Sequence, residues 1–133
     1  MANSYVEKFK DPQWQKKRLE MLDRDEWTCQ MCGDKSSPLN VHHKWYKEGM
    51  NPWEYPDSCL VTLCEDCHSS EHECKKEYTD VLLAEILGKG LFYSDLLDLA
   101  CQFSFMTPED FRQRFQVWNN QWNKKKETNK DGE

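Results

Sequence analysis

The sequence predicts an α+β fold in which a small core rich in cysteine and histidine follows an N-terminal helix and precedes a C-terminal helical extension. Apolar residues recur at helical spacing in residues 1–27 and again in residues 74–133. Between them, residues 28–73 hold five of the seven cysteines and all four histidines, with only short apolar runs. A chain of 133 residues is one small domain or a small domain with an appendage.

The N-terminal segment, residues 1–27, contains a helix start at Asp11-Pro12. Aspartate is a favoured N-cap, and proline fits the first helical position because the N–H group that it lacks has no partner there. An apolar stripe at helical spacing follows, formed by Trp14, Leu19, Met21 and Leu22. We therefore expect one amphipathic helix before the cysteine-rich segment.

Residues 28–73 contain two candidate strands, residues 39–42 and 60–63, which are short apolar runs bounded by turn-forming residues. The first run ends at His42 and the second leads into Cys64, and both of these residues can ligate a metal. From Cys64 to about Tyr78 the sequence is polar, which fits a short helix. The predicted core is thus two strands followed by a helix.

The extension, residues 74–133, has three helical stretches and a polar tail. Apolar residues over 81–87 are closed by Gly88, a second helix can open at Ser94, and a third begins at Thr107-Pro108 with two acids in its first turn. One face of this last helix is aromatic: Phe111, Phe115, Trp118 and Trp122. We expect this face to pack into the protein's own core, because small domains need the buried area. The alternatives are a homodimer or a protein partner held through these helices.

The composition excludes several classes of protein. No apolar run approaches the roughly 18 residues of a membrane span, so we expect no membrane association. The start of the chain shows no basic region followed by an apolar stretch, which predicts a cytoplasmic protein whose cysteines are metal ligands more readily than disulfides. The net charge is −6, and residues 28–73 carry three basic and eight acidic side chains, so bulk electrostatics alone does not favour nucleic-acid binding.

Two Cys-x-x-Cys pairs, Cys29/Cys32 and Cys64/Cys67, form the most specific metal-binding pattern. A two-residue gap lets both thiolates of a pair reach one cation, and two such pairs complete a closed tetrahedral site for structural zinc. Gly33 favours the tight turn after the first pair. Ordinary buried cysteines and a redox pair are the alternatives, but a redox pair usually sits in a thioredoxin-like βαβ pattern, which the sequence lacks. A four-thiolate site has no open coordination position, so any reactivity must lie elsewhere.

The four histidines form a second candidate site. His68 and His72 lie one turn apart on the predicted helix and therefore share a face. His42 and His43 are adjacent in a predicted strand, so their side chains point to opposite faces, which allows one to ligate a cation while the other faces a substrate. Each histidine alone fits an exposed polar position, and His68 also fits the zinc site. The set together favours a second metal site.

From about Asp11 to His72, a little under half of its length, the chain resembles the HNH endonucleases, or ββα-metal nucleases, in the branch with a four-cysteine zinc site. Three stretches carry the resemblance: CQMC at 29–32, LNVHH at 39–43 and LVTLCEDCH at 60–68. Residues 51–57 look like a loop found in many bacterial and phage members. The resemblance implies a treble-clef-like core and a cytoplasmic protein of bacterial or phage type. It does not extend to residues 74–133.

The resemblance also implies a role for each histidine. His42 becomes a ligand of a catalytic cation, His43 the general base and His68 a second ligand, while His72 matches a further ligand position used by some members. One position departs from the pattern. Cys59 stands where the family has an asparagine that steadies the loop carrying the general base. This departure concerns the efficiency of catalysis more than the fold, because neither the base nor the ligands are lost.

The implied activity is metal-dependent hydrolysis of DNA phosphodiester bonds, by an endonuclease or a nickase. A neutral His43 takes a proton from water, and a single divalent cation stabilises the phosphate and the leaving 3′ oxygen. Imidazole ligands favour Mn, Ni, Co or Zn over Mg by intrinsic affinity, and Mg stays a candidate as the ion that serves in the cell. Family analogy favours double-stranded DNA over RNA as the substrate.

Candidate substrate contacts follow the general base directly: Lys44, Trp45 and Lys47. Because residues 28–73 are acidic, further phosphate contacts must come from basic groups in the flanks. These are residues 16–18, Arg112, Arg114 and residues 124–126. The alternative function is a zinc-braced module, weakly active or inactive as a nuclease, that binds nucleic acid or protein. The acidic charge and Cys59 favour this alternative, whereas the intact histidines favour the nuclease.

Overall fold

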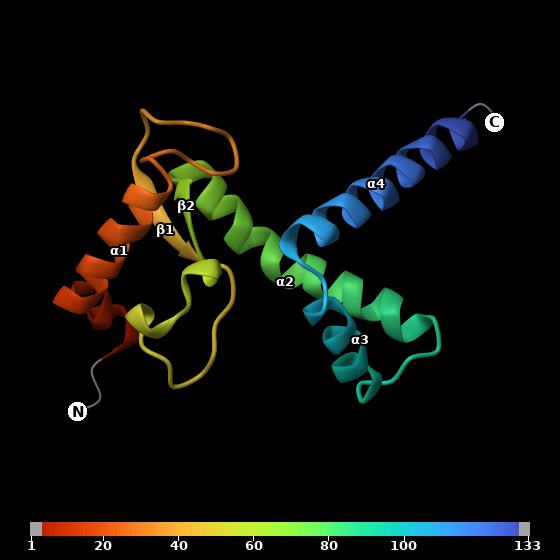
Figure 1. The fold of residues 1–133 in the computed structure, drawn as a ribbon, viewed down its shortest axis with the longest axis horizontal. Coiled ribbons are helices and arrows are strands. Elements are labelled where there is room, and N and C mark those ends of the chain that lie inside the picture. The colour runs from red at the N-terminus through yellow and green to blue at the C-terminus, as the bar shows by residue number, and fades with distance from the viewer. Residues whose placement is uncertain (1–3, 131–133) are drawn as a thin grey trace. The chain divides into compact units, whose positions relative to one another are not determined.

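A computed structural model describes residues 4–130 of the chain (Figure 1). Its elements, in chain order, are the 3₁₀ helix η1 (Tyr5–Lys10), α1 (Pro12–Arg24), β1 (Leu39–His43), η2 (Pro52–Glu54), η3 (Asp57–Cys59), β2 (Leu60–Cys64), α2 (Glu65–Gly88), α3 (Asp95–Ser104) and α4 (Pro108–Lys130). Helices and a two-stranded sheet make a mixed fold, so the predicted α+β class is confirmed. Residues 1–3 and 131–133, the outer ends of the predicted N-terminal segment and polar tail, lie outside the described residues. None of the described helices is long and apolar enough to cross a membrane.

The chain divides into two compact units, Met1–Asp80 and Val81–Glu133. We expected a short helix ending near Tyr78 and a separate apolar one over residues 81–87. Both belong to the single helix α2, because neither glycine nor proline interrupts the sequence before Gly88. The predicted boundary between residues 73 and 74 therefore lies inside α2.

Helix α1 begins where the sequence predicts. The Asp11 carboxylate accepts a hydrogen bond from the backbone N–H of Gln13 at 2.8 Å, and Pro12 is the first helical residue. Trp14, Met21 and Leu22 are buried, whereas 49% of Leu19 is exposed. Leu19 lies five residues after Trp14, which turns it away from the buried side of the helix.

Strands β1 and β2 pair antiparallel, with Leu39 opposite Cys64 and His43 opposite Leu60. Helix α1 contacts both strands and the η2 turn, and Figure 1 shows it beside β1. The core of the first unit forms there, around the fully buried side chains of Leu22, Tyr55 and Leu60. This small core brings the end of β1 and the beginning of α2 into one region of the first unit.

A polar link joins the end of α1 to β2. The Asp25 carboxylate accepts hydrogen bonds from the backbone N–H of Thr62 at 2.9 Å and from the Arg24 guanidinium at 2.8 and 2.9 Å. Arg24 also donates to the backbone carbonyls of Asp57 and Leu60, both at 2.7 Å. Burial alone would raise the pKa of Asp25, but the hydrogen bonds from Arg24 and Thr62 outweigh it and lower the pKa. The carboxylate therefore stays ionised and holds β2 in place.

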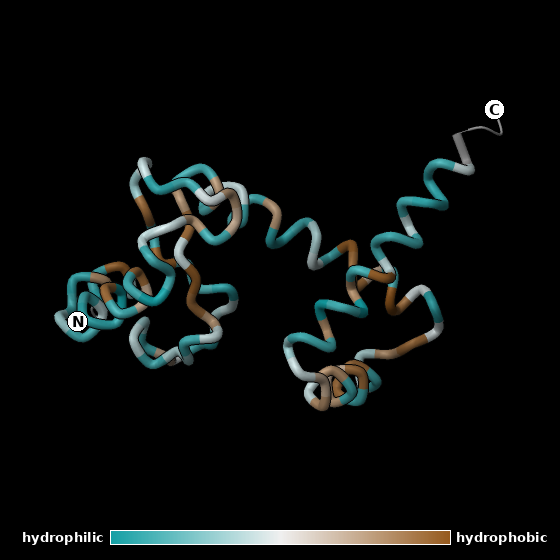
Figure 2. Tube along the Cα trace, turned by 45° about the horizontal axis from the view of Figure 1, so that its top comes forward, coloured by the Kyte–Doolittle hydropathy of each residue, from teal (hydrophilic) through white to brown (hydrophobic). Residues whose placement is uncertain are grey.

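The second unit contains the end of α2 together with α3 and α4. Helix α4 starts at the predicted cap: the Thr107 hydroxyl accepts from the backbone N–H of Asp110 at 3.1 Å, and the Asp110 carboxylate accepts from Thr107 N–H at 3.2 Å. The helix continues to Lys130, so it includes most of the predicted polar tail. Its C-terminal half is hydrophilic along almost its whole length (Figure 2).

The aromatic face of α4 is not buried, contrary to our expectation of an intramolecular core. The exposed fractions are 38% for Phe111, 58% for Phe115, 48% for Trp118 and 56% for Trp122. Phe111 meets Phe103 of α3 edge to face, with ring centroids 5.4 Å apart. Helix α3 has 10 residues and α4 has 23, so α3 is too short to cover the rest of the face. A homodimer or a protein partner through this face stays a prediction.

Candidate functional site

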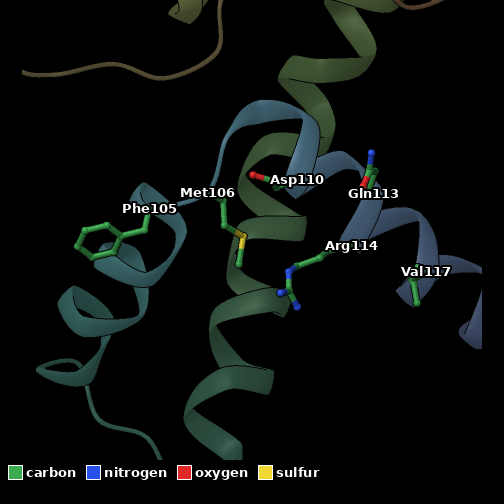
Figure 3. Close-up of a pocket in the computed structure, with 6 residues that line it drawn as sticks. All are labelled: Phe105, Met106, Asp110, Gln113, Arg114 and Val117. Atoms are coloured by element: carbon green, nitrogen blue, oxygen red, sulfur yellow. The ribbon is translucent and has the colours of Figure 1, made fainter.

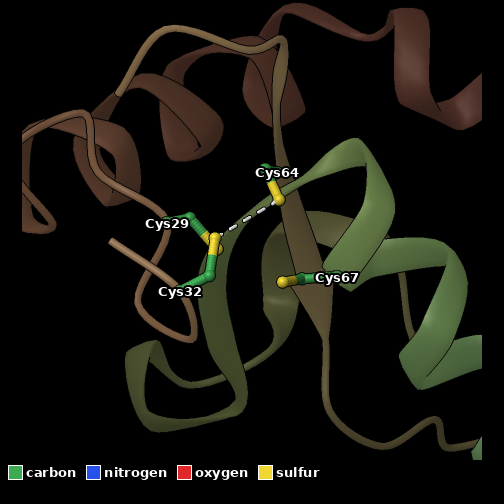
Figure 4. Close-up of side chains that lie close together, drawn as sticks. All are labelled: Cys29, Cys32, Cys64 and Cys67. Carbon is green, nitrogen blue, oxygen red and sulfur yellow. Dashed lines mark hydrogen bonds between the residues drawn. The ribbon is translucent and has the colours of Figure 1, made fainter. Parts of the chain in front are cut away.

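Four cysteines from three parts of the first unit converge. Cys29 and Cys32 lie in the turn between α1 and β1, Cys64 ends β2, and Cys67 lies in the first turn of α2 (Figure 4). Their sulfur atoms all lie within 4.8 Å of one another, and those of Cys32 and Cys64 are 3.7 Å apart. Sulfurs at about 2.3 Å from one ion in a tetrahedron would be about 3.8 Å apart, so the cluster fits zinc.

The first cysteine pair is shaped by its backbone. The carbonyl of Cys29 accepts from the N–H of Gly33 at 2.9 Å, and its own N–H donates to the carbonyl of Asp34 at 2.9 Å. Gly33 has a φ of 81°, a conformation that glycine adopts at little cost, which agrees with its predicted role in this turn. The N–H of Gln30 donates to the carbonyl of Thr62 and so fastens the turn to β2.

The electrostatics of the four sulfurs also favour a cation. Burial opposes ionisation of Cys29, but the backbone N–H groups of Cys32 and Cys64 stabilise its thiolate and lower its pKa to about 6. The neighbouring sulfur of Cys64 raises the pKa of Cys67. The protein alone thus favours the thiolate of Cys29, and a Zn²⁺ ion would stabilise the thiolate form of all four cysteines.

Three histidines form a second cluster in the same unit. His42 comes from β1, and His68 and His72 come from successive turns of α2; one nitrogen of each lies within 4.8 Å of the others. The Nε2 atoms of His68 and His72 are 3.0 Å apart. Two imidazole nitrogens at about 2.1 Å from one ion would lie about 3.0 to 3.4 Å apart. In the described part of the chain, the buried Nδ1 of His42 has no hydrogen-bond partner. Donor type and spacing therefore fit a divalent cation.

The imidazoles of His42 and His68 are disposed to be neutral, as metal ligands must be. Burial, followed by the nearby His68 and His72, lowers the pKa of His42 to about 4. Burial also lowers the pKa of His68. At neutral pH the lone pairs of these rings are consequently available to an ion.

His43 points to the other face of β1, as alternation in a strand requires. Its ring stacks on Trp14 and on Tyr46, with centroid distances of 5.0 and 5.3 Å, and its Nε2 lies 3.0 Å from the carbonyl oxygen of Pro52. A carbonyl only accepts, so Nε2 must donate, and the lone pair of the neutral ring is on Nδ1. Burial lowers the pKa of His43, although the hydrogen bond to Pro52 opposes this. The result is a fixed, neutral imidazole.

His43, His68 and His72 line one cavity of about 320 Å³. Its other walls include the aromatic rings of Phe9, Trp14 and Tyr46, and the side chains of Arg18, Asn40 and Val41. The structure therefore brings the histidine predicted as the base and two of the predicted ligands to the same space. His42 joins them through its ring contacts with His68 and His72, at centroid distances of 5.2 and 5.1 Å.

The loop after β1 holds the other predicted residues. Lys44, Trp45 and Lys47 are all exposed, and Lys44 lines a separate cavity together with His42. Cys59 is fully buried; its thiol lies 3.5 Å from the carbonyl of Trp45, and its own carbonyl accepts from the N–H of Lys44 at 2.9 Å. Cys59 thus holds the residues that directly follow His43.

Two contacts of His43 are not evident from the sequence. Trp14 has the spacing of a core residue, and nothing in the sequence indicates that its ring meets an imidazole. The carbonyl of Pro52 is presented by η2, which is closed by a capping box between Asn51 and Glu54. The resemblance of residues 51–57 to a family loop is the signal that could have pointed to this carbonyl.

A larger cavity, of about 480 Å³, lies in the second unit (Figure 3). Its lining is Phe105, Met106, Asp110, Gln113, Arg114 and Val117. It contains neither histidine nor cysteine, and its carboxylate already serves the cap of α4. Cavity volume alone therefore does not locate the chemistry of this protein.

Comparisons with protein-family models, with curated proteins and with solved structures found no significant match. What the chain does must therefore be inferred from the two clusters and the cavity beside them.

Proposed function

We propose that the chain is a metal-dependent nuclease of the HNH type that hydrolyses phosphodiester bonds in DNA. One observation carries the proposal: three imidazoles gather at one point, and two of them share a cavity with His43. One strand and one helix supply all four rings, and the cysteine cluster spans the junction between β2 and that helix. The same observation supports separate roles for the adjacent histidines, because their rings have different neighbours.

His43 is the general base in this proposal. Its Nδ1 takes the proton of the attacking water, while Nε2–H keeps its hydrogen bond to the Pro52 carbonyl. The stacking of the ring on Trp14 and Tyr46 limits its rotation, which favours a fixed direction for proton transfer. Cys59 supports the base indirectly, because it anchors the backbone that follows His43.

His42, His68 and His72 would hold the divalent cation, with Mn, Ni, Co, Zn or Mg as candidates. When bound, the cation supplies positive charge to the phosphate and to the leaving 3′ oxygen. The four cysteines would hold a structural zinc ion, whose part is to keep β2 and the start of α2 in place. The two clusters therefore have separate tasks, one structural and one chemical.

The test is incubation of the purified protein with supercoiled plasmid and Mn²⁺ or Mg²⁺, with a chelator as the negative control. We expect nicked or linear DNA from the wild-type protein. His43→Gln should lose cleavage yet keep its zinc content and its affinity for Mn²⁺ by calorimetry. His68→Ala should lose both Mn²⁺ binding and cleavage. Glu73→Gln, an exposed change on the same helix, is the matched control and should cleave like wild type. Undiminished cleavage by His43→Gln would remove His43 as the base.

The acidic character of residues 28–73 favours a second candidate, a zinc-braced module that binds nucleic acid or protein without cutting. In the same assay this module would leave the plasmid intact with both Mn²⁺ and Mg²⁺. A gel-shift measurement with the uncut plasmid would then show whether nucleic acid is its ligand.

A further inference from the structure

The cavity that holds His43 contains one permanently charged side chain among the described residues, Arg18 of α1. We infer that Arg18 binds a phosphate group of the DNA that enters this cavity. The inference rests on the proposed nuclease function and names the group that grips its substrate. It also assigns a task to a helix that lies outside the cysteine- and histidine-rich segment.

Three consecutive cations on α1 have three different surroundings, because successive helical residues point about 100° apart. Lys16 is exposed and lies beside Glu20 and Trp53. Lys17 forms an ion pair with Asp57. Arg18 is half-buried and faces the cavity, and in the part of the chain that the structure describes its guanidinium has neither an ion pair nor a hydrogen bond. The sequence identifies all three residues as candidate phosphate contacts, and among them only Arg18 lines the cavity.

The chemistry of the cavity explains why this cation suits a phosphate. A guanidinium presents N–H donors in a planar fork that matches two phosphate oxygens, and such charge-assisted pairs are stronger than neutral ones. Arg18 is the one permanently charged side chain among the described residues that line the cavity, so it supplies the fixed positive charge beside the imidazoles. Residues 28–73 carry three basic and eight acidic side chains, which makes a cation from another segment necessary for holding an anion there.

The walls around Arg18 fit the remainder of a nucleotide. Phe9 and Tyr46 line the same cavity, and 44% of Tyr46 is exposed although the His43 ring stacks on it. Lys75 lies over the Tyr46 ring at 4.7 Å from its centroid. Aromatic rings beside an arginine favour a nucleotide over a free inorganic anion, because a sugar or a base can contact the rings.

The experiment measures binding of a fluorescent DNA duplex by anisotropy, with chelator present and over a range of KCl concentrations. Arg18→Ala should weaken binding about 10-fold or more, as expected for loss of a hydrogen bond to a charged group. The slope of log affinity against log salt should also become shallower by about 0.9, the value for one phosphate contact. Arg18→Lys keeps the charge without the fork, so it should retain the slope and lose part of the affinity.

Lys16→Ala is the matched control, because it removes a cation from the same helix outside the cavity. Its affinity should stay within about twofold of wild type, the level of a weak surface contact. Affinity and salt slope that are the same for Arg18→Ala and Lys16→Ala would overturn the inference. The unfolding midpoints of both variants are measured as well. A lower midpoint for Arg18→Ala with an unchanged salt slope would show that the role of Arg18 is purely structural.

A parallel cleavage assay separates this inference from the proposed function. If the wild-type protein cuts plasmid and Arg18→Ala cuts and binds like Lys16→Ala, the proposed role of Arg18 is wrong. The proposed nuclease function would then still hold. A wild-type protein that does not cut, but whose binding depends on Arg18 as described, overturns the nuclease and supports the phosphate contact.

Discussion

The two units of the chain differ in how their helices are stabilised. In Met1–Asp80, side chains from α1, both strands and the intervening loop are buried together, and two clusters of metal-ligating residues lie next to them. In the described residues of Val81–Glu133, no side chain is buried, although α4 is 23 residues long. Local signals such as caps and helical spacing are therefore enough to specify helices, whereas a core requires that distant segments meet.

Removing one cysteine of the cluster should have the largest effect on folding, and this effect should be confined to the first unit. Cys29→Ala removes a buried candidate ligand. In small zinc domains, zinc binding contributes about 10–16 kcal/mol to the free energy of folding. We expect loss of bound zinc and of the cooperative unfolding transition. Zinc analysis and calorimetry measure both.

Cys101→Ala is the control for this change, because Cys101 is an exposed cysteine of α3 outside the cluster. It should leave zinc content and the unfolding transition at their wild-type values. A Cys29→Ala variant that kept one zinc ion per chain and an unchanged transition would show that the cluster does not brace the fold.

A pair of leucine substitutions measures the difference between the two units directly. Leu22 is fully buried in the first unit, and 71% of Leu97 is exposed in the second. Leu22→Ala should lower the free energy of unfolding by about 2–5 kcal/mol, because it leaves a cavity in the core. Leu97→Ala should change it by less than about 0.5 kcal/mol. Chemical denaturation of both variants provides the values, and a large loss for Leu97→Ala would reveal a partner or a second copy covering α3.

Breaking the polar link between α1 and β2 should have an intermediate effect on the free energy of unfolding. Asp25→Ala leaves the Thr62 N–H and the Arg24 guanidinium without their acceptor and should cost about 1–3 kcal/mol of unfolding free energy. Asp23→Ala, an exposed acid two residues earlier, is the matched comparison and should be close to neutral. Equal denaturation midpoints for the two variants would mean that the link contributes nothing measurable.

The smallest effect should come from the cap of α4. Thr107→Ala removes the hydroxyl that accepts from Asp110 N–H and should destabilise the first turn of α4 by about 1 kcal/mol. Hydrogen exchange of the amides at residues 109–111 should become faster, while exchange in the first unit stays unchanged. Thr128→Ala, near the other end of the helix, should leave those amides as they are. Faster exchange in both units would indicate that the second unit contributes to the stability of the first.

The sequence predicts best those features that depend on neighbouring residues. The caps at Asp11 and Thr107, the two strands and the cysteine spacing are local, and the structure agrees with each. The sequence predicted two helices where the structure has the single helix α2, because the apolar group that ends at Gly88 has the pattern of a complete helix. The exposure of the α4 face was missed because spacing defines a face and says nothing of what covers it.

In the candidate site, too, the sequence predicts the local features and misses the contacts between distant segments. The spacing of His68 and His72 places them on one face of a helix, and alternation separates His42 from His43. The contacts of His43 with Trp14 and the Pro52 carbonyl join residues from three separate segments, so only the fold reveals them. Arg18 is one of several basic residues in the sequence, and its position on the cavity wall sets it apart.

The pairing of His43 with Leu60 constrains how the length of this chain can change over evolution. An insertion at the exposed Gly49, in the loop between the strands, leaves the register of the ladder intact. Deletion of a single residue within Leu39–His43 would exchange the two sides of the ribbon and turn the wrong imidazole toward α2. Homologues should therefore vary in length in this loop and keep the spacing of the strand invariant.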